Sequence, residues 1–255
     1  MRIFYLANNR VGSEALSWLR DQGENIVGLA IHPLERRRFG DEILSAIDLA
    51  PEFIFDGSQL GQAEIVSQIG ALHPDIALSV YFGYILKPMF IETFPLGVIN
   101  LHPSYLPYNR GANPNIWSIL DGTPTGATLH YVDPGIDTGD VIARRRIDVE
   151  PIDTGKSLYH RLETCCIELL ADTWPLIRDG DAGRIPQDRR SGSEHRTRDA
   201  LQIGRIDLDR DYTARELIDL VRALTFPPYP GAYFVEEGRK VYLRLQLCYE
   251  EGLDQ

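Results

Sequence analysis

The sequence is poor in cysteine, in basic residues and in long hydrophobic runs, and each shortage excludes a class of protein. Three cysteines among 255 residues, two of them adjacent at Cys165 and Cys166, are too few for a disulfide framework and show no metal-ligand spacing. We expect reduced, buried thiols in a cytoplasmic protein. No apolar run approaches the roughly 20 residues that cross a bilayer, and the N-terminal MRIFYLANN lacks the parts of a signal peptide. We therefore expect no membrane partner.

The shortage of positive charge bears on the partners of the protein. Lys and Arg number 26 against 37 Asp and Glu, which gives a formal net charge of −11. This field repels a polyanion unless a local basic patch outweighs it. The nearest candidates, Arg36–Arg38 and the stretch from Arg184 to Arg198, are clusters that do not form a face. The composition argues against a nucleic-acid partner.

The first half of the chain alternates short apolar runs with segments of helical period. Apolar residues at 44% and charged residues at 25% are globular proportions, so a buried core is expected. Strands separated by helices of about ten residues are typical of βαβ units. The pattern predicts an α/β fold with a Rossmann-like, mostly parallel sheet flanked by helices. The expected strands are residues 2–6, 26–31, 53–55, 75–80 and 97–102, and the expected helices are 13–23, 41–49 and 63–72.

The second half changes to paired strands and one long helix. Strands are expected over residues 126–132 and 141–149, followed by an amphipathic helix over 155–178. Thr213 and Glu216 form a capping box before a helix over 214–224, and a β-hairpin follows. Residues 181–200, rich in Gly, Ser and charge, indicate a linker. The predicted parts are a main domain (1–180), this linker, and a small helix and hairpin region (201–255).

A compact polar pair stands at the end of the strand over 97–102. Asn100 and His102 are two residues apart, so both side chains project from the same face of the strand. Ligands of open parallel sheets collect beyond the carboxyl ends of the strands. An imidazole can relay a proton there, and an amide can donate to an oxyanion. The alternative is a capping asparagine and a histidine whose hydrogen bonds are satisfied by the local backbone. The motif N-L-H-P, residues 100–103, is about equally compatible with this alternative.

A second polar motif, D-P-G-I-D-T-G-D, follows the strand over 126–132. Its glycines permit a tight turn and a close approach of backbone to ligand. Asp137 in its centre can hold the imidazole of His102 in one tautomer. An Asx-rich turn and a calcium loop are the alternatives, although the spacing misses the calcium-helix pattern. None of the six histidines shows ligand spacing, and we expect no metal.

Together, V-I-N-L-H-P-S-Y-L-P-Y-N-R-G-A-N-P and H-Y-V-D-P-G-I-D-T-G-D resemble the folate-dependent formyltransferases. The resemblance extends over residues 1 to 180 and is sharpest from Gly97 to Ile142. It implies that Asn100, His102 and Asp137 are the catalytic residues and that 10-formyl-tetrahydrofolate is the co-substrate. It also implies that the backbone around residues 80–86 receives the pterin ring. The candidate cofactor-binding residues are Tyr81, Phe82, Gly83, Tyr84, Ile85, Leu86, Asp133 and Asp140.

The tail bears on which amine accepts the formyl group. The segment DYTARELIDLVRALTFPPYPGAYF resembles the opening of the C-terminal domain of methionyl-tRNA formyltransferase, but the sequence stops after one hairpin. The resemblance then implies a sugar N-formyltransferase acting on a nucleotide-linked amino sugar, such as a dTDP- or GDP-4-amino-4,6-dideoxyhexose, for lipopolysaccharide O-antigen. A homodimer through the tail is expected by analogy. Methionyl-tRNA formyltransferase, 10-formyl-tetrahydrofolate hydrolase and a non-enzymatic folate- or nucleotide-binding module remain as alternatives. The hydrolase is disfavoured because the sequence begins directly with the catalytic domain.

Four residues are candidates for contact with the acceptor. Tyr105, Arg110 and Asn113 lie in the loop that follows His102, where a sugar or phosphate would meet the catalytic residues. Each has a purely structural role as its alternative. Asn9 is the fourth candidate, but for Asn8 and Asn9 together we favour capping of the next helix.

Overall fold

The computed structural model describes residues 1–188 and 190–252. Arg189, in the predicted linker, and residues 253–255, in the predicted C-terminal region, lie outside the described residues. The chain divides into two compact units, each made of discontinuous segments. The first unit contains Met1–His102, Ala127–Arg144 and Cys166–Asp188. The second contains Pro103–Gly126, Arg145–Cys165 and the described residues from 190 to 252.

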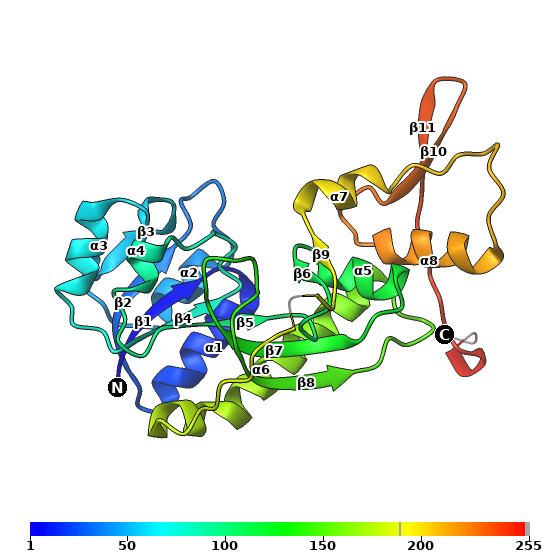
Figure 1. The fold of residues 1–255 in the computed structure, drawn as a ribbon. Coiled ribbons are helices and arrows are strands. Elements are labelled where there is room, and N and C mark those ends of the chain that lie inside the picture. Colours follow the sequence, from blue (N-terminus) through cyan, green and yellow to red (C-terminus); the bar gives the residue numbers. More distant parts are fainter. Residues whose placement is uncertain (189, 253–255) are drawn as a thin grey trace. The chain divides into compact units, whose positions relative to one another are not determined.

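A seven-stranded sheet in the order β3-β2-β1-β4-β5-β7-β8, most of whose residues belong to the first unit, is the main sheet of the protein (Figure 1). β1 to β5 pair in parallel, whereas β7 is antiparallel to β5. The predicted α/β class with a mostly parallel sheet is therefore confirmed. The strands are β1 (Arg2–Ala7), β2 (Asn25–Ile31), β3 (Ile54–Asp56), β4 (Ile76–Val80), β5 (Val98–His102), β7 (Thr125–Tyr131) and β8 (Val141–Ile147).

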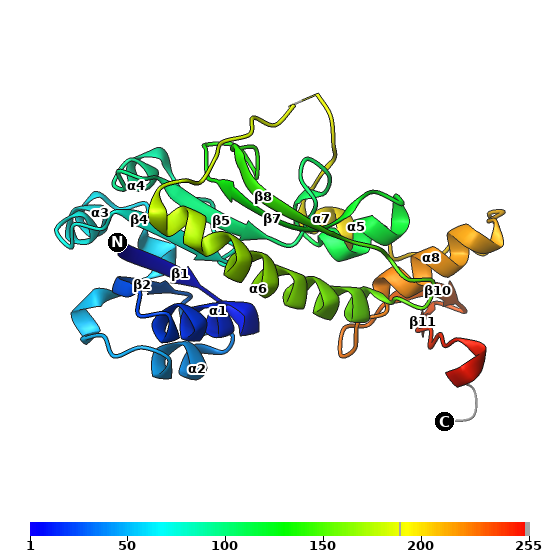
Figure 2. The same cartoon turned by 90° about the horizontal axis from the view of Figure 1, so that it is seen from below.

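Helices cover both faces of this sheet because successive strand residues point to opposite sides. Phe4 and Leu6 of β1 enter a core cluster with Phe90, on the face covered by α3 (Ala63–Gly70) and α4 (Pro88–Ile91). Tyr5 points the other way, and its hydroxyl donates to the carbonyl oxygen of Gly12 in α1 (Asn9–Asp21) at 2.8 Å. Figures 1 and 2 show the same division, with α1 opposite α3 and α4. β1, from Ile3 to Ala7, is thus buried on both faces.

The short helices depart from the sequence prediction at their ends. α1 begins at Asn9, four residues before the predicted start at Ser13, and ends before Gly23, whose φ of +77° is the left-handed conformation common after helices. α2 (Gly40–Ser45) is shorter than predicted and follows Phe39, which also has a positive φ. The predicted start of α1 and the predicted end of α2 are therefore wrong, because the spacing of apolar residues does not mark the residues at which these helices begin and end. The 3₁₀ helices η1 (Pro51–Phe53) and η2 (Gly57–Gln59) flank β3.

In the second unit, helices and one hairpin pack around two small apolar clusters. Leu158 and Leu162 of α6 (Gly155–Asp179) pack with Ile119 of α5 and Ala223 of α8, and Val221 packs with Ala232 of the hairpin. The capping box is confirmed: the Thr213 hydroxyl accepts from the Glu216 backbone N–H at 3.1 Å. In return, the Thr213 backbone N–H donates to the Glu216 carboxylate at 2.8 Å, and so does its hydroxyl at 3.0 Å, and these bonds lower the pKa of that carboxyl. The other elements are β6 (Arg110–Gly111), α5 (Pro114–Leu120), β9 (Glu194–His195), α7 (Thr197–Gln202), α8 (Ala214–Leu224), β10 (Ala232–Glu236), β11 (Arg239–Leu243) and η3 (Glu250–Gly252).

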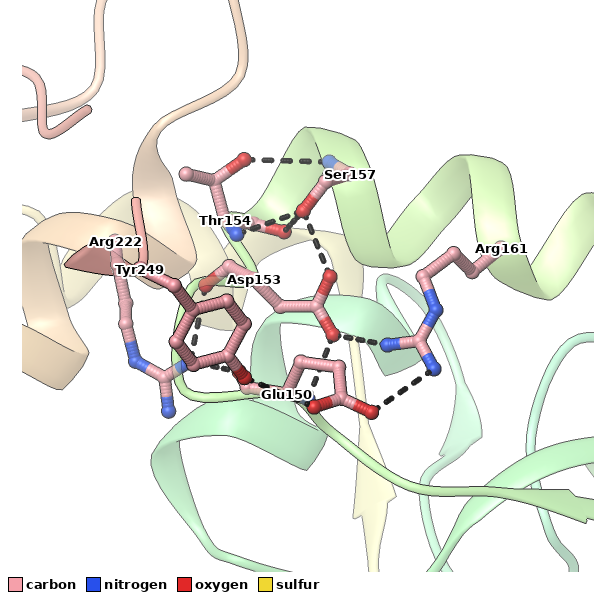
Figure 3. A network of polar contacts seen from close by, with 7 residues as sticks. All are labelled: Glu150, Asp153, Thr154, Ser157, Arg161, Arg222 and Tyr249. Carbon is pink, nitrogen blue, oxygen red and sulfur yellow. Dashed lines mark hydrogen bonds and ion pairs between the residues drawn. The ribbon is translucent and has the colours of Figure 1, made fainter. Parts of the chain in front are cut away.

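A buried carboxylate, Asp153, organises the start of α6 (Figure 3). It is 3% exposed and accepts hydrogen bonds from the Glu150 backbone N–H at 2.8 Å and the Ser157 hydroxyl at 2.9 Å. The Arg161 guanidinium also pairs with it. Arg222 of α8 donates to the carbonyl oxygens of Glu150, at 3.2 Å, and of Asp153, at 2.9 Å. The network therefore ties the residues before α6 to α6 itself and to α8.

Two further expectations concern the burial of the three cysteines and the presence of a helix able to cross a membrane. Cys165 and Cys166 are buried free thiols, but Cys248 is exposed, so the expectation that all three are buried is wrong for Cys248. Exposed and partly buried side chains alternate from residue 242 to residue 248, and Cys248 falls on the exposed side. Within residues 1–188 and 190–252, no helix combines the length and the apolar character needed to cross a bilayer.

Candidate active site

The candidate site begins at the carboxyl end of β5. Asn100 and His102 lie on one face of this strand, as their spacing predicts. Asn100 is in register with Ser79 of β4 on one side and with His130 of β7 on the other. His102 is 6% exposed, whereas Asn100 is only partly buried. The pairing of strands thus surrounds the asparagine with two further polar side chains.

These neighbours determine the orientation of the Asn100 amide. The Ser79 hydroxyl donates to Asn100 Oδ1 at 2.9 Å, so the amide nitrogen faces His130 Nε2 at 3.2 Å. His130 Nδ1 donates to the carbonyl oxygen of Tyr131 at 2.8 Å, which leaves Nε2 of the neutral ring to accept from the amide. The second N–H of the Asn100 amide has no acceptor among the described residues. It is available to an oxygen atom of a ligand.

Asp137 approaches both imidazoles of the site. Its Oδ2 lies 3.5 Å from His102 Nε2 and its Oδ1 lies 3.5 Å from His130 Nε2. The Asp137 side chain is 16% exposed. The structure therefore brings Asn100, His102 and Asp137 together and adds His130, which the sequence analysis missed. A signal existed, since His130 precedes the loop motif on a predicted strand, but the pairing of that strand with β5 was unknown.

The loop over residues 133–140, called here the aspartate loop, is held by its own polar groups. Asp133 Oδ1 accepts from the Gly135 backbone N–H at 3.0 Å and from the Thr138 hydroxyl at 2.6 Å. A side chain on Gly139 would place its Cβ 1.9 Å from the Tyr131 carbonyl oxygen, so glycine is required there. Asp137 has a φ of +51°, a left-handed conformation that aspartate tolerates better than most residues. The turn interpretation therefore applies to Asp133, while the carboxylate of Asp137 is directed to the histidines.

The predicted pterin segment follows β4 with an irregular backbone. Tyr81 and Gly83 have φ values of +53° and +76°. Phe82 and Leu86 are buried in the core, whereas Gly83 is exposed and Ile85 is 76% exposed. Two buried side chains thus anchor the segment and leave peptide groups between them at the surface. Tyr84 is partly buried, and so is Asp140, whose carbonyl oxygen accepts from the Tyr131 N–H across the base of the aspartate loop at 2.8 Å.

A relay of hydrogen bonds connects this segment to the loop after β2. The Arg38 backbone N–H donates to Asn8 Oδ1 at 2.8 Å, so the Asn8 amide nitrogen faces His32 Nδ1 at 3.3 Å. His32 Nε2 must then carry the proton, which it donates to the carbonyl oxygen of Phe82. Burial lowers the pKa of His32. Asn8 occupies the N-cap position of α1 without a side-chain cap, so the capping interpretation is wrong, because its amide is engaged by the loop instead.

The predicted acceptor contacts lie in different places. Asn9 is partly buried with a φ of +64°, and its backbone N–H donates to the Arg38 carbonyl oxygen at 3.2 Å. Tyr105, Arg110 and Asn113 belong to the second unit. Arg110 is 6% exposed and donates to the Ser191 carbonyl oxygen at 3.4 Å, while Asn113 precedes α5 with a φ of +56°. Among the described residues, no group of three or more His, Cys, Asp or Glu side chains is arranged to hold a metal ion.

Two family models match the sequence. The model described as "Formyl transferase" matches residues 35–173, which is more than half of the chain and includes the whole cluster from Ser79 to Asp137. The chain belongs to the formyl transferase family. The model described as "N-formyltransferase dimerization C-terminal domain" matches residues 199–249. The resemblance to the formyltransferases that the two sequence motifs carry is confirmed.

Individual members of the formyl transferase family resemble this chain over most of its length. A methionyl-tRNA formyltransferase from Geotalea daltonii is 33% identical over 269 residues, covering 99% of this chain and 81% of the relative. The structure of a 4-N formyltransferase from Francisella tularensis matches with a TM-score of 0.83 at 26% identity, covering 97% and 98% of the two chains. The formyltransferase PseJ from Anoxybacillus kamchatkensis, solved with UDP-4,6-dideoxy-4-formamido-L-AltNAc and tetrahydrofolate, is 32% identical with a TM-score of 0.58, covering 79% of this chain and 89% of PseJ.

Proposed function

We propose that this member of the formyl transferase family moves the formyl group of 10-formyl-tetrahydrofolate onto the amino group of a nucleotide-linked amino sugar. The observation that carries the proposal is the convergence of one amide, two imidazoles and one carboxylate at the end of β5. Formyl transfer requires a donor for an oxyanion and a carrier for a proton, and this cluster contains both.

The amide serves the first half of the reaction. The neutral amine attacks the formyl carbon, a carbon–nitrogen bond forms, and the carbonyl oxygen becomes an oxyanion. The remaining N–H of Asn100 donates to that oxyanion, while Ser79 and His130 hold the amide in place. Removal of one such donor typically costs roughly 10² to 10³ in rate.

The imidazole serves the second half. His102 takes a proton from the new ammonium and delivers it to N10 of the folate as the bond between that nitrogen and the formyl carbon breaks. The products are a formamide and tetrahydrofolate. Asp137, 3.5 Å from His102 Nε2, stabilises the imidazolium in between. Acid–base help of this kind is worth roughly 10² to 10⁴ in rate.

The remaining contacts follow from the same proposal. The peptide groups around Gly83, between the buried Phe82 and Leu86, receive the pterin, with Tyr81, Tyr84, Ile85, Asp133 and Asp140 beside them. Tyr105, Arg110, Asn113 and Asn9 remain proposed acceptor contacts. The free thiols support a cytoplasmic location.

The sugar acceptor is supported by structural likeness and by charge. The Francisella 4-N formyltransferase aligns over 97% of this chain and 98% of its own, and PseJ was solved with a formylated nucleotide sugar. The net charge of −11 is unfavourable for a tRNA partner. An amino sugar destined for lipopolysaccharide O-antigen is the acceptor that we propose. The match of residues 199–249 to a dimerization domain supports a homodimer.

A second candidate is formylation of methionyl-tRNA, which the 33% identity to the Geotalea enzyme favours. One experiment separates the two. The protein is incubated with 10-formyl-tetrahydrofolate and either nucleotide-linked 3- and 4-amino sugars or charged initiator tRNA, and mass spectrometry follows the gain of one formyl group. We expect formylation of a sugar. Formylation of the tRNA alone would overturn the sugar assignment.

A further inference from the structure

The aspartate loop is bracketed by a segment that follows α6. Residues 184–187, called here the strap, run beside the base of this loop in the first unit. The backbone of Ile185 exchanges two hydrogen bonds with Val141, at 2.8 and 2.9 Å. The Arg184 guanidinium lies 3.4 Å from the centre of the Tyr131 ring. The strap is thereby fastened to the residues on both sides of the loop.

Gln187 of the strap contacts the loop itself. Its amide nitrogen donates to the carbonyl oxygen of Asp137 at 2.9 Å and to that of Gly139 at 2.7 Å. Both partners are acceptors, so the nitrogen rather than the oxygen of the amide must face them. The two N–H groups of one side chain thus clamp the two peptide carbonyls that flank Thr138.

The clamp acts where the backbone is strained. Asp137 has a positive φ, a conformation that costs energy at any residue other than glycine, so a contact from outside the loop helps to hold it. The direction of the Asp137 peptide sets the direction of its Cα–Cβ bond, and with it the position of the carboxylate. Asp133 holds residues 135 and 138 but makes no bond to either of the carbonyls that Gln187 binds.

We propose that Gln187 is a positioning residue for formyl transfer. Its amide holds the aspartate loop so that the Asp137 carboxylate stays 3.5 Å from both His102 and His130. The inference rests on the proposed function, since it assigns Asp137 a part in the reaction. Gln187 acts through Asp137 and touches no reacting atom.

The first test replaces Gln187 by methionine, which keeps the length of the side chain but removes both donors. A misplacement of about 1 Å at a reacting group costs on the order of 10²-fold in rate, so we expect kcat to fall by roughly 10- to 100-fold with little change in KM for either substrate. Gln68→Glu, on the exposed face of α3, is the control and retains full activity. If the methionine variant does not fold, Gln187→Glu replaces it, because a carboxylate of the same shape cannot donate to the two carbonyls.

A double variant distinguishes positioning from a merely structural role. In an Asp137→Asn background, Gln187→Met causes no further loss of kcat, since the residue it positions is already disabled. A multiplicative loss in the double variant would overturn the proposal.

A readout that needs no substrate separates this inference from the proposed function. The ring nitrogen NMR signals of His102 report the neighbouring carboxylate, and Gln187→Met shifts them in the same direction as Asp137→Asn does. Gln68→Glu leaves them unchanged. Signals identical to wild type in Gln187→Met overturn the positioning role even if transfer activity is found, and the expected shift supports it even if no amine is formylated.

Discussion

Two shielded carboxylates, Asp137 and Asp153, lie in very different surroundings. Asp153 accepts from a backbone N–H at 2.8 Å and from a hydroxyl at 2.9 Å and pairs with a guanidinium, all within its own unit. Asp137 stands 3.5 Å from each of two imidazoles, those of His102 and His130. A carboxylate enclosed by permanent donors stabilises the fold. A carboxylate beside an imidazole, at longer range, can stabilise a proton that the ring of His102 carries during a reaction.

The two clusters also differ in how the chain assembles them. Asp153 finds Glu150, Ser157 and Arg161 within eight residues of itself, so most of its network is local. The Asp137 cluster gathers side chains from β4, β5, β7 and the aspartate loop, across parallel and antiparallel pairings. The first needs only the start of a helix to form, whereas the second needs the completed sheet.

The largest expected effect is on the catalytic side of this comparison. His102→Ala removes the proposed proton carrier, and we expect kcat to fall by roughly 10² to 10⁴ while the thermal midpoint changes little. Single-turnover assays with 10-formyl-tetrahydrofolate and a sugar acceptor measure the loss. His73→Asn, an exposed histidine with a positive φ that asparagine tolerates, is the control. Near-normal turnover in the alanine variant would remove His102 from the mechanism.

At Asp153 we expect the opposite result, a loss of stability without a loss of kcat. Asp153→Ala removes the acceptor of three hydrogen bonds, each worth about 1.5 to 3 kcal/mol when the acceptor is charged, but Arg161 is partly exposed and regains water. We expect a loss of about 3 kcal/mol in the free energy of unfolding, measured in urea, with kcat at low temperature unchanged. Asp148→Ala, whose side chain is 82% exposed, is the matched control and changes little. A fall in kcat without loss of stability would contradict the division of roles.

The smallest effect is expected at a third polar cluster, in which His32 bonds to the Asn8 amide and to the Phe82 carbonyl oxygen. Because burial lowers the pKa of His32 below 6.5, the unfolded chain binds more protons than the folded one as the pH falls through 6.5. The contribution to stability is therefore complete above the unfolded pKa and declines on the acid side. We expect His32→Gln, which keeps a donor to the Phe82 carbonyl, to flatten the acid slope of the urea midpoint. An unchanged slope would show that other groups produce it.

Some residues of the candidate site could be predicted from the sequence, and others could not. The spacing of Asn100 and His102 predicted a shared face, and the D-P-G-I-D-T-G-D motif predicted the position of Asp137 on a loop; the structure agrees on both geometries. His130 was missed because nothing in the sequence states which residue of β7 lies opposite Asn100. Asn8 was misassigned because a residue before a helix usually caps it, and only the folded loop over 36–38 supplies a competing donor.

The sequence by itself determined the periodic elements, the family and the residue types available for catalysis, because strand alternation, helical period and turn chemistry are local properties. Tertiary structure alone decided which of those residues meet. The register of β5 against β7 selects His130, and the return of residue 187 to the aspartate loop selects its clamp. Such contacts join positions up to 50 residues apart, and no local preference encodes a partner at that separation.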